Sequence, residues 1–253
     1  MQCRPTVKDI YDFIDKTAPF ANQCEWDNSG MLVGESNKEV GKIAFVLDIT
    51  PEAVTKAAEI GADLIVSHHP VIFRAAKNFT DNNPAFLLAK NGISAICAHT
   101  SLDCAAGGVN DVLASVLGLK NALPLTENGE TAMIRAAEFE TDADTLAKLV
   151  CDKLATGVRL ADSGRPIKKV AVCGGAGGDF IGAVADSGCD AYVTGDVSHH
   201  EFLDALALGL TVIAAGHFET ENPVMAVLAD EIKRNFAVET EIIPQTSPVK
   251  YYF

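Results

Sequence analysis

Long apolar runs, a surplus of basic residues and paired cysteines are all missing from this sequence of 253 residues. No segment approaches about 18 consecutive apolar residues, so no membrane-spanning helix is expected. The sequence has only 20 Lys and Arg residues but 34 Asp and Glu residues, which gives a formal net charge of −14. This charge disfavours nucleic-acid binding through basic patches and docking on anionic lipid. Apolar residues still make up 48%, so the chain is expected to fold around a core.

The cysteines show no CxxC or other paired spacing, and their number is odd. The N-terminal segment Met1–Tyr11 lacks the apolar stretch of a secretory signal. Both observations predict reduced thiols and a cytoplasmic location. Several of these thiols lie inside apolar runs and are expected to be small buried side chains. The seven are Cys3, Cys24, Cys97, Cys104, Cys151, Cys173 and Cys189.

Alternating strand and helix signals characterise the first half of the chain. Lys42–Thr50 is an apolar, β-branched run, and Pro51 opens a helical stretch after it. Asp63–Val66 and Ile93–Ala98 are two further short apolar runs, with a helix predicted between them. This order predicts βαβ units with parallel strands.

The second half repeats the pattern. Placing Lys42 on Lys169 also aligns Gly61 with Gly188 without a gap, and Asp63 with Asp190. We therefore predict an α/β fold of two similar modules that arose by duplication, spanning residues 1–125 and 126–253. The polar stretch Leu125–Gly129 is the expected junction between the modules. The C-terminal segment could also pack against the first module. The repeated strands are Lys169–Cys173, Asp190–Thr194 and Gly209–Ala215.

Histidine is scarce, and its positions follow the predicted strands. Four of the six histidines come directly after one, and the carboxyl ends of parallel strands meet at one edge of a sheet. These four are His68, His69, His99 and His217; the remaining two are His199 and His200.

Two matching spacings add carboxylates to these histidines. His99 precedes Asp103 by four residues, as His217 precedes Glu221, and positions i and i+4 lie on one face of a helix. Neighbouring residues of a strand point to opposite faces, so His68 and His69 are better placed to bind two adjacent ions than one. They could bind the same ion only if the strand ends at this point. Nitrogen and oxygen donors favour Zn, Mn, Fe, Co or Ni. The alternative is that all are ordinary polar loop residues.

Four segments, at residues 26–34, 67–70, 99–103 and 216–221, read WDNSGMLVG, SHHP, HTSLD and GHFETE. In this order they resemble the GTP cyclohydrolase I type 2 homologues, also called the Ngg-interacting-factor-three-like proteins. The resemblance implies a di-metal site between two α/β modules, a toroidal homohexamer built as a trimer of dimers, and His99 as a further site histidine. It also implies metal ligation by His68, His69, Asp103, His217 and Glu221, with Glu221 as the bridge between the ions.

Such a centre is suited to hydrolysis, with metal-bound hydroxide as the nucleophile. The family label implies opening of the GTP ring, although two metals serve phosphoester hydrolysis equally well. His200 is a candidate general acid, against the alternative that it only begins a helix after Ser198. A second hypothesis is a metal-binding or metal-handling protein that binds partners without catalysis. A nucleic-acid module is disfavoured by charge.

Three further features each have a functional and a purely structural interpretation. The glycine-rich turn Gly174–Asp179 fits either an anion-binding loop or a tight strand–helix turn. Arg74 and Lys77 fit either substrate contacts or surface solvation. Asp196 aligns with His69 in the repeat and is a candidate for orienting a ligand histidine.

Overall fold

The computed structural model describes residues 4–125 and 133–250, which form two compact α/β units. Unit 1 comprises residues 4–106 and 224–245, and unit 2 comprises residues 107–125, 133–223 and 246–250. No helix in these described ranges has the length and apolar character needed to cross a bilayer.

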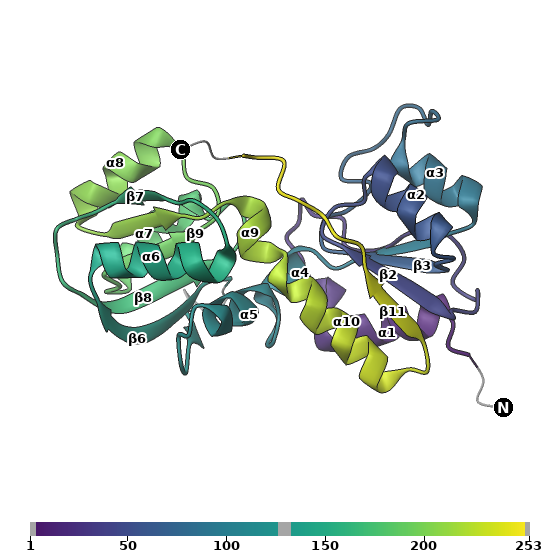
Figure 1. The fold of residues 1–253 in the computed structure, drawn as a ribbon, viewed down its shortest axis with the longest axis horizontal. Coiled ribbons are helices and arrows are strands. Elements are labelled where there is room, and N and C mark those ends of the chain that lie inside the picture. The colour runs from purple at the N-terminus through teal and green to yellow at the C-terminus, as the bar shows by residue number, and fades with distance from the viewer. Residues whose placement is uncertain (1–3, 126–132, 251–253) are drawn as a thin grey trace. The chain divides into compact units, whose positions relative to one another are not determined.

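Unit 1 is built on a five-stranded sheet with the order β1-β4-β3-β2-β11 (Figure 1). All neighbouring pairs are parallel except β1 with β4. Figure 1 shows α2 and α3 on one side of these strands and α1 and α10 on the other. The strands are β1 (Gly30–Val33), β2 (Lys42–Val46), β3 (Leu64–Ser67), β4 (Ser94–Cys97) and β11 (Glu239–Ile242). The helices are α1 (Val7–Thr17), the 3₁₀ turn η1 (Phe20–Asn22), α2 (Pro51–Glu59), α3 (Pro84–Asn91), α4 (Thr100–Cys104) and α10 (Pro223–Asn235).

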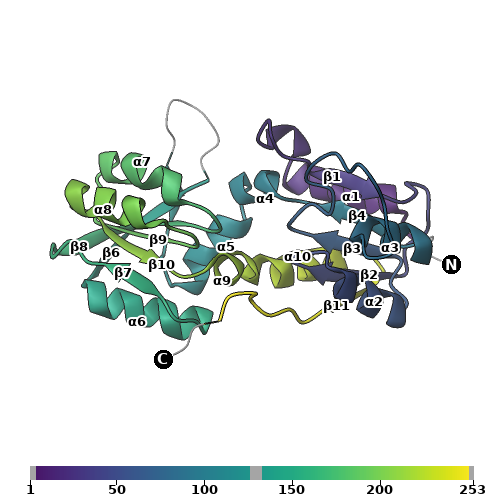
Figure 2. The ribbon, with the colours of Figure 1, turned by 90° about the horizontal axis from the view of Figure 1, so that it is seen from above.

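Unit 2 has a six-stranded sheet with the order β5-β6-β8-β9-β10-β7, in which β8, β9 and β10 are parallel. Figure 2 shows α6 on one side of this sheet and α7 and α8 on the other. The strands are β5 (Leu123–Pro124), β6 (Arg135–Thr141), β7 (Arg159–Ala161), β8 (Ile167–Cys173), β9 (Ala191–Thr194) and β10 (Thr211–Ala214). The helices are α5 (Val109–Val116), α6 (Ala143–Leu154), η2 (Gly178–Phe180), α7 (Ile181–Asp186), α8 (His199–Leu208) and α9 (His217–Glu221).

The α/β class and the two similar modules predicted from the sequence are confirmed, and one hydrogen-bond motif recurs in both. Asp63 Oδ2 accepts from the backbone N–H groups of Gly41 and Lys42 at 2.8 and 3.2 Å. Asp190 Oδ2 accepts from those of Lys168 and Lys169 at 2.8 and 3.0 Å. Each aspartate therefore ties the start of its parallel strand to the strand beside it.

The division between the units differs from the predicted boundary at residue 125. The first crossing lies after Ala106, because Leu113, Leu117 and Leu119 pack into the core of unit 2 against β8 and β9. The C-terminal segment does return to unit 1, where β11 pairs with β2 from Glu239 opposite Lys42 to Ile242 opposite Phe45. Residues 126–129 of the expected join lie outside the described residues.

Alternation along the strands determines both cores. In unit 1, Ala44 and Val46 of β2 pack with Val54 of α2 and Leu88 of α3. In unit 2, Val170 and Val172 of β8 pack against α5 and α6, whereas Ala171 and Cys173 pack against the layer of α7 and α8. Because helices cover both faces of these parallel strands, polar functional groups are expected in the loops at the carboxyl ends of the strands.

Candidate metal centre

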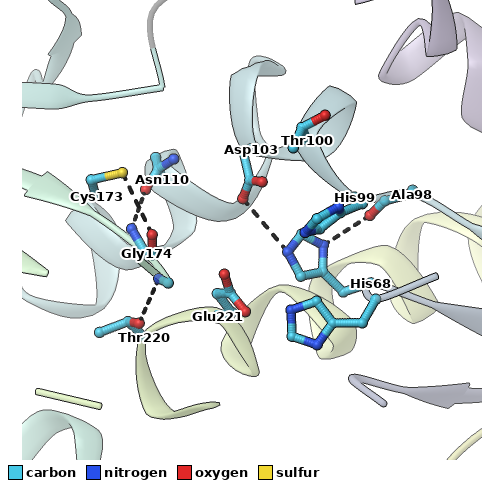
Figure 3. A network of polar contacts seen from close by, with 12 residues as sticks. His68, Ala98, His99, Thr100, Asp103, Asn110, Cys173, Gly174, Thr220 and Glu221 are labelled. Carbon is cyan, nitrogen blue, oxygen red and sulfur yellow. Dashed lines mark hydrogen bonds and ion pairs between the residues drawn. The ribbon is translucent and has the colours of Figure 1, made fainter. Parts of the chain in front are cut away.

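His68 and His69 follow β3 at the point where the strand ends. Ser67 Oγ donates to the carbonyl oxygen of His69 at 2.8 Å, so the backbone turns there instead of continuing as a strand. The two rings consequently lie close together, with centroids 5.0 Å apart, and not on opposite faces as an unbroken strand would place them. His68 is fully buried, and its Nδ1 lies 2.8 Å from the carbonyl oxygen of Ala98 (Figure 3).

His99 brings a third imidazole to the same place. It follows β4, and its ring centroid lies 5.2 Å from that of His68 and 5.4 Å from that of His69. One ligand nitrogen from each ring fits within a group whose atoms all lie within 4.8 Å of one another. Three imidazoles at this spacing form a group that is able to hold a transition-metal ion.

Asp103, four residues after His99, lies beside His68. Asp103 Oδ1 is 3.6 Å from His68 Nε2, and both side chains are largely buried (Figure 3). Residues 100–104 form α4 as expected, but His99 is its N-cap, with φ −99° and ψ −113°. Because the N-cap residue is not helical, the i, i+4 rule does not apply to its side chain.

In unit 2, the second predicted pair does form across one helical turn. His217 and Glu221 lie on α9, and His217 Nε2 is 3.2 Å from Glu221 Oε2. Gly175 faces this pair with φ +68°. A Cβ at that position would overlap Glu221 Oε1 and lie 3.3 Å from His217 Nε2. The absence of a side chain at Gly175 therefore provides the space that the Glu221 carboxylate occupies.

Each of these four histidines has its Nδ1 next to an oxygen acceptor. His69 Nδ1 lies 2.7 Å from Asp48 Oδ1, and His217 Nδ1 lies 2.7 Å from Asp196 Oδ2. His99 Nδ1 lies 2.8 Å from Asp27 Oδ1, and His68 Nδ1 has the Ala98 carbonyl. An acceptor at Nδ1 favours the tautomer that carries its proton there, which leaves Nε2 with a lone pair for a metal.

The donor set thus fits divalent transition metals. All four histidines are prepared for ligation through Nε2, and buried carboxylates lie near two of those nitrogens. Carboxylate or carbonyl partners behind metal-binding imidazoles are a regular feature of metal sites, where they set ring orientation and ligand basicity. The structure supports a metal-binding function on this chemistry, while the number and identity of the ions stay predictions.

The pKa of the Asp27 carboxyl group is strongly perturbed. Burial alone would raise the pKa of this carboxyl group, but hydrogen bonds from His99 and Thr100 outweigh burial and hold the pKa well below its usual value. Thr100 donates to Asp27 Oδ2 both through its backbone N–H, at 3.1 Å, and through its hydroxyl, at 2.6 Å. Asp27 is therefore a carboxylate throughout the physiological pH range.

Sequence reasoning missed Asp27 and Asp48 as partners of the histidines. The signal for Asp48 was present, since it follows β2 at the same edge of the sheet as His69 follows β3. Asp27 belongs to the 26–34 segment, which contributed only to the family resemblance. For Asp196, the predicted orienting role agrees with its contact to His217.

The remaining candidates lie at the surface or inside a tight turn. His200 is exposed at the start of α8, with Nδ1 2.9 Å from Ser198 Oγ. Arg74 and Lys77 are exposed in the loop after β3. In the glycine-rich turn, Gly174 N–H donates to Asn110 Oδ1 at 2.7 Å and Gly175 N–H to Thr220 Oγ1 at 3.0 Å (Figure 3). These internal bonds favour the tight-turn interpretation over an anion-binding loop.

The Duf34/NIF3 (NGG1p interacting factor 3) family matches residues 5–248. This chain belongs to that family. Among curated relatives, the GTP cyclohydrolase 1 type 2 homolog of Clostridium perfringens is 32% identical over 248 residues, covering 94% of this chain and 95% of the relative. The homolog of the same name from Campylobacter jejuni is 31% identical, covering 97% of this chain and 99% of the relative.

Solved structures of other proteins share the fold. A hypothetical protein from Staphylococcus aureus has a TM-score of 0.88 at 27% identity, covering 98% of this chain and all of its own. Reduced HcgD from Methanocaldococcus jannaschii has a TM-score of 0.83 at 30% identity, covering 94% of this chain and 97% of its own. The resemblance inferred from four short segments is therefore confirmed at the level of the family.

Proposed function

We propose that this Duf34/NIF3 protein is a metal-dependent hydrolase that uses two divalent ions per chain. The proposed ligands are His68, His69 and Asp103 from unit 1 and His217 and Glu221 from unit 2. The observation that carries the proposal is the oxygen acceptor at Nδ1 of each ligand histidine, which prepares His68, His69 and His217 for ligation through Nε2. When bound, such ions lower the pKa of water and stabilise developing negative charge.

The proposed substrate is a nucleotide or a related small molecule. The support comes from relatives named GTP cyclohydrolase 1 type 2 homolog, which suggests opening of the guanine ring of GTP. Phosphoester hydrolysis would need the same metal chemistry. In either reaction His99 is the proposed site residue next to the reacting atoms, because Asp27 fixes its ring and 13% of its side chain stays accessible.

His200 is the proposed general acid for the leaving group. Its ring is exposed, and Ser198 Oγ near Nδ1 limits its rotation. A His200→Gln variant should lower kcat and remove one limb of the pH–rate profile while metal content stays unchanged. An unchanged profile would mean that His200 only begins α8.

Metal analysis of Asp103→Asn and Glu221→Gln proteins tests the ligand assignment. These nearly isosteric changes should retain the fold by circular dichroism, reduce the bound metal by at least one ion per chain and abolish turnover in a screen of nucleotides and phosphoesters. Glu219→Gln, on the same short helix as Glu221, is the matched control and should keep both metal and turnover. Turnover that is undiminished in metal-stripped wild-type protein would contradict the proposal.

The alternative is a metal-handling or partner-binding protein without catalysis, assembled as a toroidal homohexamer. The family description as an interacting factor supports this second role. Tight metal binding without turnover of any compound in the same screen would favour it. Sedimentation of the purified chain tests the hexamer separately, and the cytoplasmic location stays a prediction from the cysteines.

A further inference from the structure

Two large aromatic side chains stand exposed next to His99 in unit 1. Trp26 is 60% exposed and Phe73 is 45% exposed. Their ring centroids lie 5.9 and 6.3 Å from that of His99, with interplanar angles of 72° and 76°. The Trp26 and Phe73 rings are themselves 5.9 Å apart. The planes of both rings are therefore steeply inclined to that of the imidazole, and the three rings form one aromatic cluster.

Hydrogen bonds hold the backbone next to both rings. Trp26 precedes Asp27, whose fully buried carboxylate accepts from His99. Phe73 follows Ile72, whose carbonyl oxygen accepts from Asn28 Nδ2 at 2.5 Å. This bond joins the loop before β1 to the loop after β3, so the two aromatic residues are kept together although 47 positions separate them.

Exposed aromatic rings held in place are unusual at a protein surface and typical of recognition sites. A ring that enters beside Trp26 and Phe73 would bury apolar surface on both and meet the edge of His99. Aromatic side chains bind nucleobases in this way, and each stacked base contributes about 1–3 kcal/mol. Arg74 follows Phe73 in sequence and is exposed, so a ligand bound at Phe73 that carries an anionic group would have a cationic residue nearby.

We propose that Trp26 and Phe73 bind the planar aromatic ring of the substrate and present it to the His99 side of the metal centre. The ligand class is a nucleobase or similar heterocycle that carries an anionic group. This assignment rests on the proposed hydrolase function, which it deepens by naming the recognition element. Trp26 and Phe73 determine specificity and are not assigned a step in the reaction.

Trp26 is the only tryptophan in the chain, so intrinsic fluorescence reports on this ring alone. The metal-loaded protein is titrated with GMP, with ribose 5-phosphate as the non-aromatic control, using excitation at the red edge of the tryptophan band. GMP should quench Trp26 with a saturable curve, and ribose 5-phosphate should not. Free N-acetyltryptophanamide under the same conditions corrects for collisional quenching.

Variants of Phe73 separate stacking from general surface effects. Phe73→Ala should weaken GMP binding about tenfold or more, whereas Phe73→Tyr should restore it. Phe79→Ala, which removes another exposed ring from the same loop, should bind like the wild type. Equal binding by Phe73→Ala, or linear quenching without saturation, would overturn the proposal.

Two further outcomes are distinguishable. If Trp26 emission changes with protein concentration and not with GMP, the aromatic pair is an interface between copies of the chain, and the proposal is wrong. Saturable quenching without turnover would retain the aromatic site and count only against the hydrolase function. Turnover by a Phe73→Ala protein with unchanged KM for every purine nucleotide tested would reject the aromatic site and leave the hydrolase standing.

Discussion

Asp27 Oδ1 lies 2.8 Å from His99 Nδ1, a contact between two residues that are 72 positions apart in the chain. The carboxylate is fully buried, and its second oxygen accepts from Thr100 and from the hydroxyl of Ser29. With both oxygens occupied by donors, Asp27 has one stable orientation. It therefore holds His99 in the tautomer that leaves Nε2 available.

Replacing Asp27 with asparagine should lower turnover, because His99 would lose the partner that fixes its ring. The amide keeps the size of the side chain but loses the charge, and its NH₂ group would face donors of Thr100 and Ser29 if its oxygen stayed on His99. Loss of such a partner typically lowers activity by about 10–100-fold. Turnover in the nucleotide and phosphoester screen measures the change, and Asp81→Asn in the exposed loop after β3 is the control. Equal turnover by the two variants would show that Asp27 has no influence on the reaction.

The acid dependence of stability should also report on Asp27. Its pKa is lower in the folded protein than the usual value of about 3.9 in an unfolded chain. The carboxylate therefore stabilises the fold fully above the unfolded pKa, and this contribution falls as the pH drops toward the folded pKa. In metal-free protein, the difference in unfolding free energy between wild type and Asp27→Asn should shrink as the pH falls below about 4. A difference that does not change in this acid range would contradict the assignment of Asp27 as a buried, hydrogen-bonded carboxylate.

Gly175→Ala should reduce the metal content of the protein by displacing Glu221. Gly188→Ala is a matched control, because Gly188 has φ +73° and no atom within 4 Å of the added Cβ. Both changes cost about 1–2 kcal/mol through the left-handed backbone, but only the first overlaps the carboxylate. Thermal unfolding and metal content separate the two effects. Loss of metal in both variants would assign the effect to backbone strain.

Asp63→Ala and Asp190→Ala should destabilise the protein to a similar extent. Each removes one carboxylate that accepts from two backbone N–H groups, so a loss of about 1–3 kcal/mol is expected for each. Asp204→Ala, on the exposed side of α8, should change the unfolding free energy by less than about 0.5 kcal/mol. Denaturant unfolding measures all three. A large loss for one aspartate alone would argue against equivalent roles in the two modules.

Much of the repeated part of the fold was predictable from the sequence. The strands β2, β3 and β4 and their counterparts β8, β9 and β10 lie where short apolar runs predicted them, because buried parallel strands have a strong apolar signal. The edge strand β11 was missed, since its residues Glu239–Ile242 are mostly exposed and carry two carboxylates. β11 depends on pairing with β2 for its conformation.

The pairing of His99 with Asp103 shows why spacing was insufficient at the site. The same four-residue interval produces a contact between His217 and Glu221 on α9. At α4 the first residue of the interval is an N-cap, so His99 turns to Asp27 and Asp103 lies beside His68. A four-residue interval therefore predicts a contact only where both residues lie inside the helix.

By itself the sequence determined the α/β class, the two similar modules and the position of four histidines at the carboxyl ends of strands, because local periodicity and strand endings are properties of neighbouring residues. Only the tertiary structure decided that Asp27, Asp48, Asp196 and the Ala98 carbonyl hold those histidines at Nδ1. It also decided that Trp26 and Phe73 lie beside His99. Such contacts join loops that are 21 to 73 residues apart, a separation that no periodic pattern encodes.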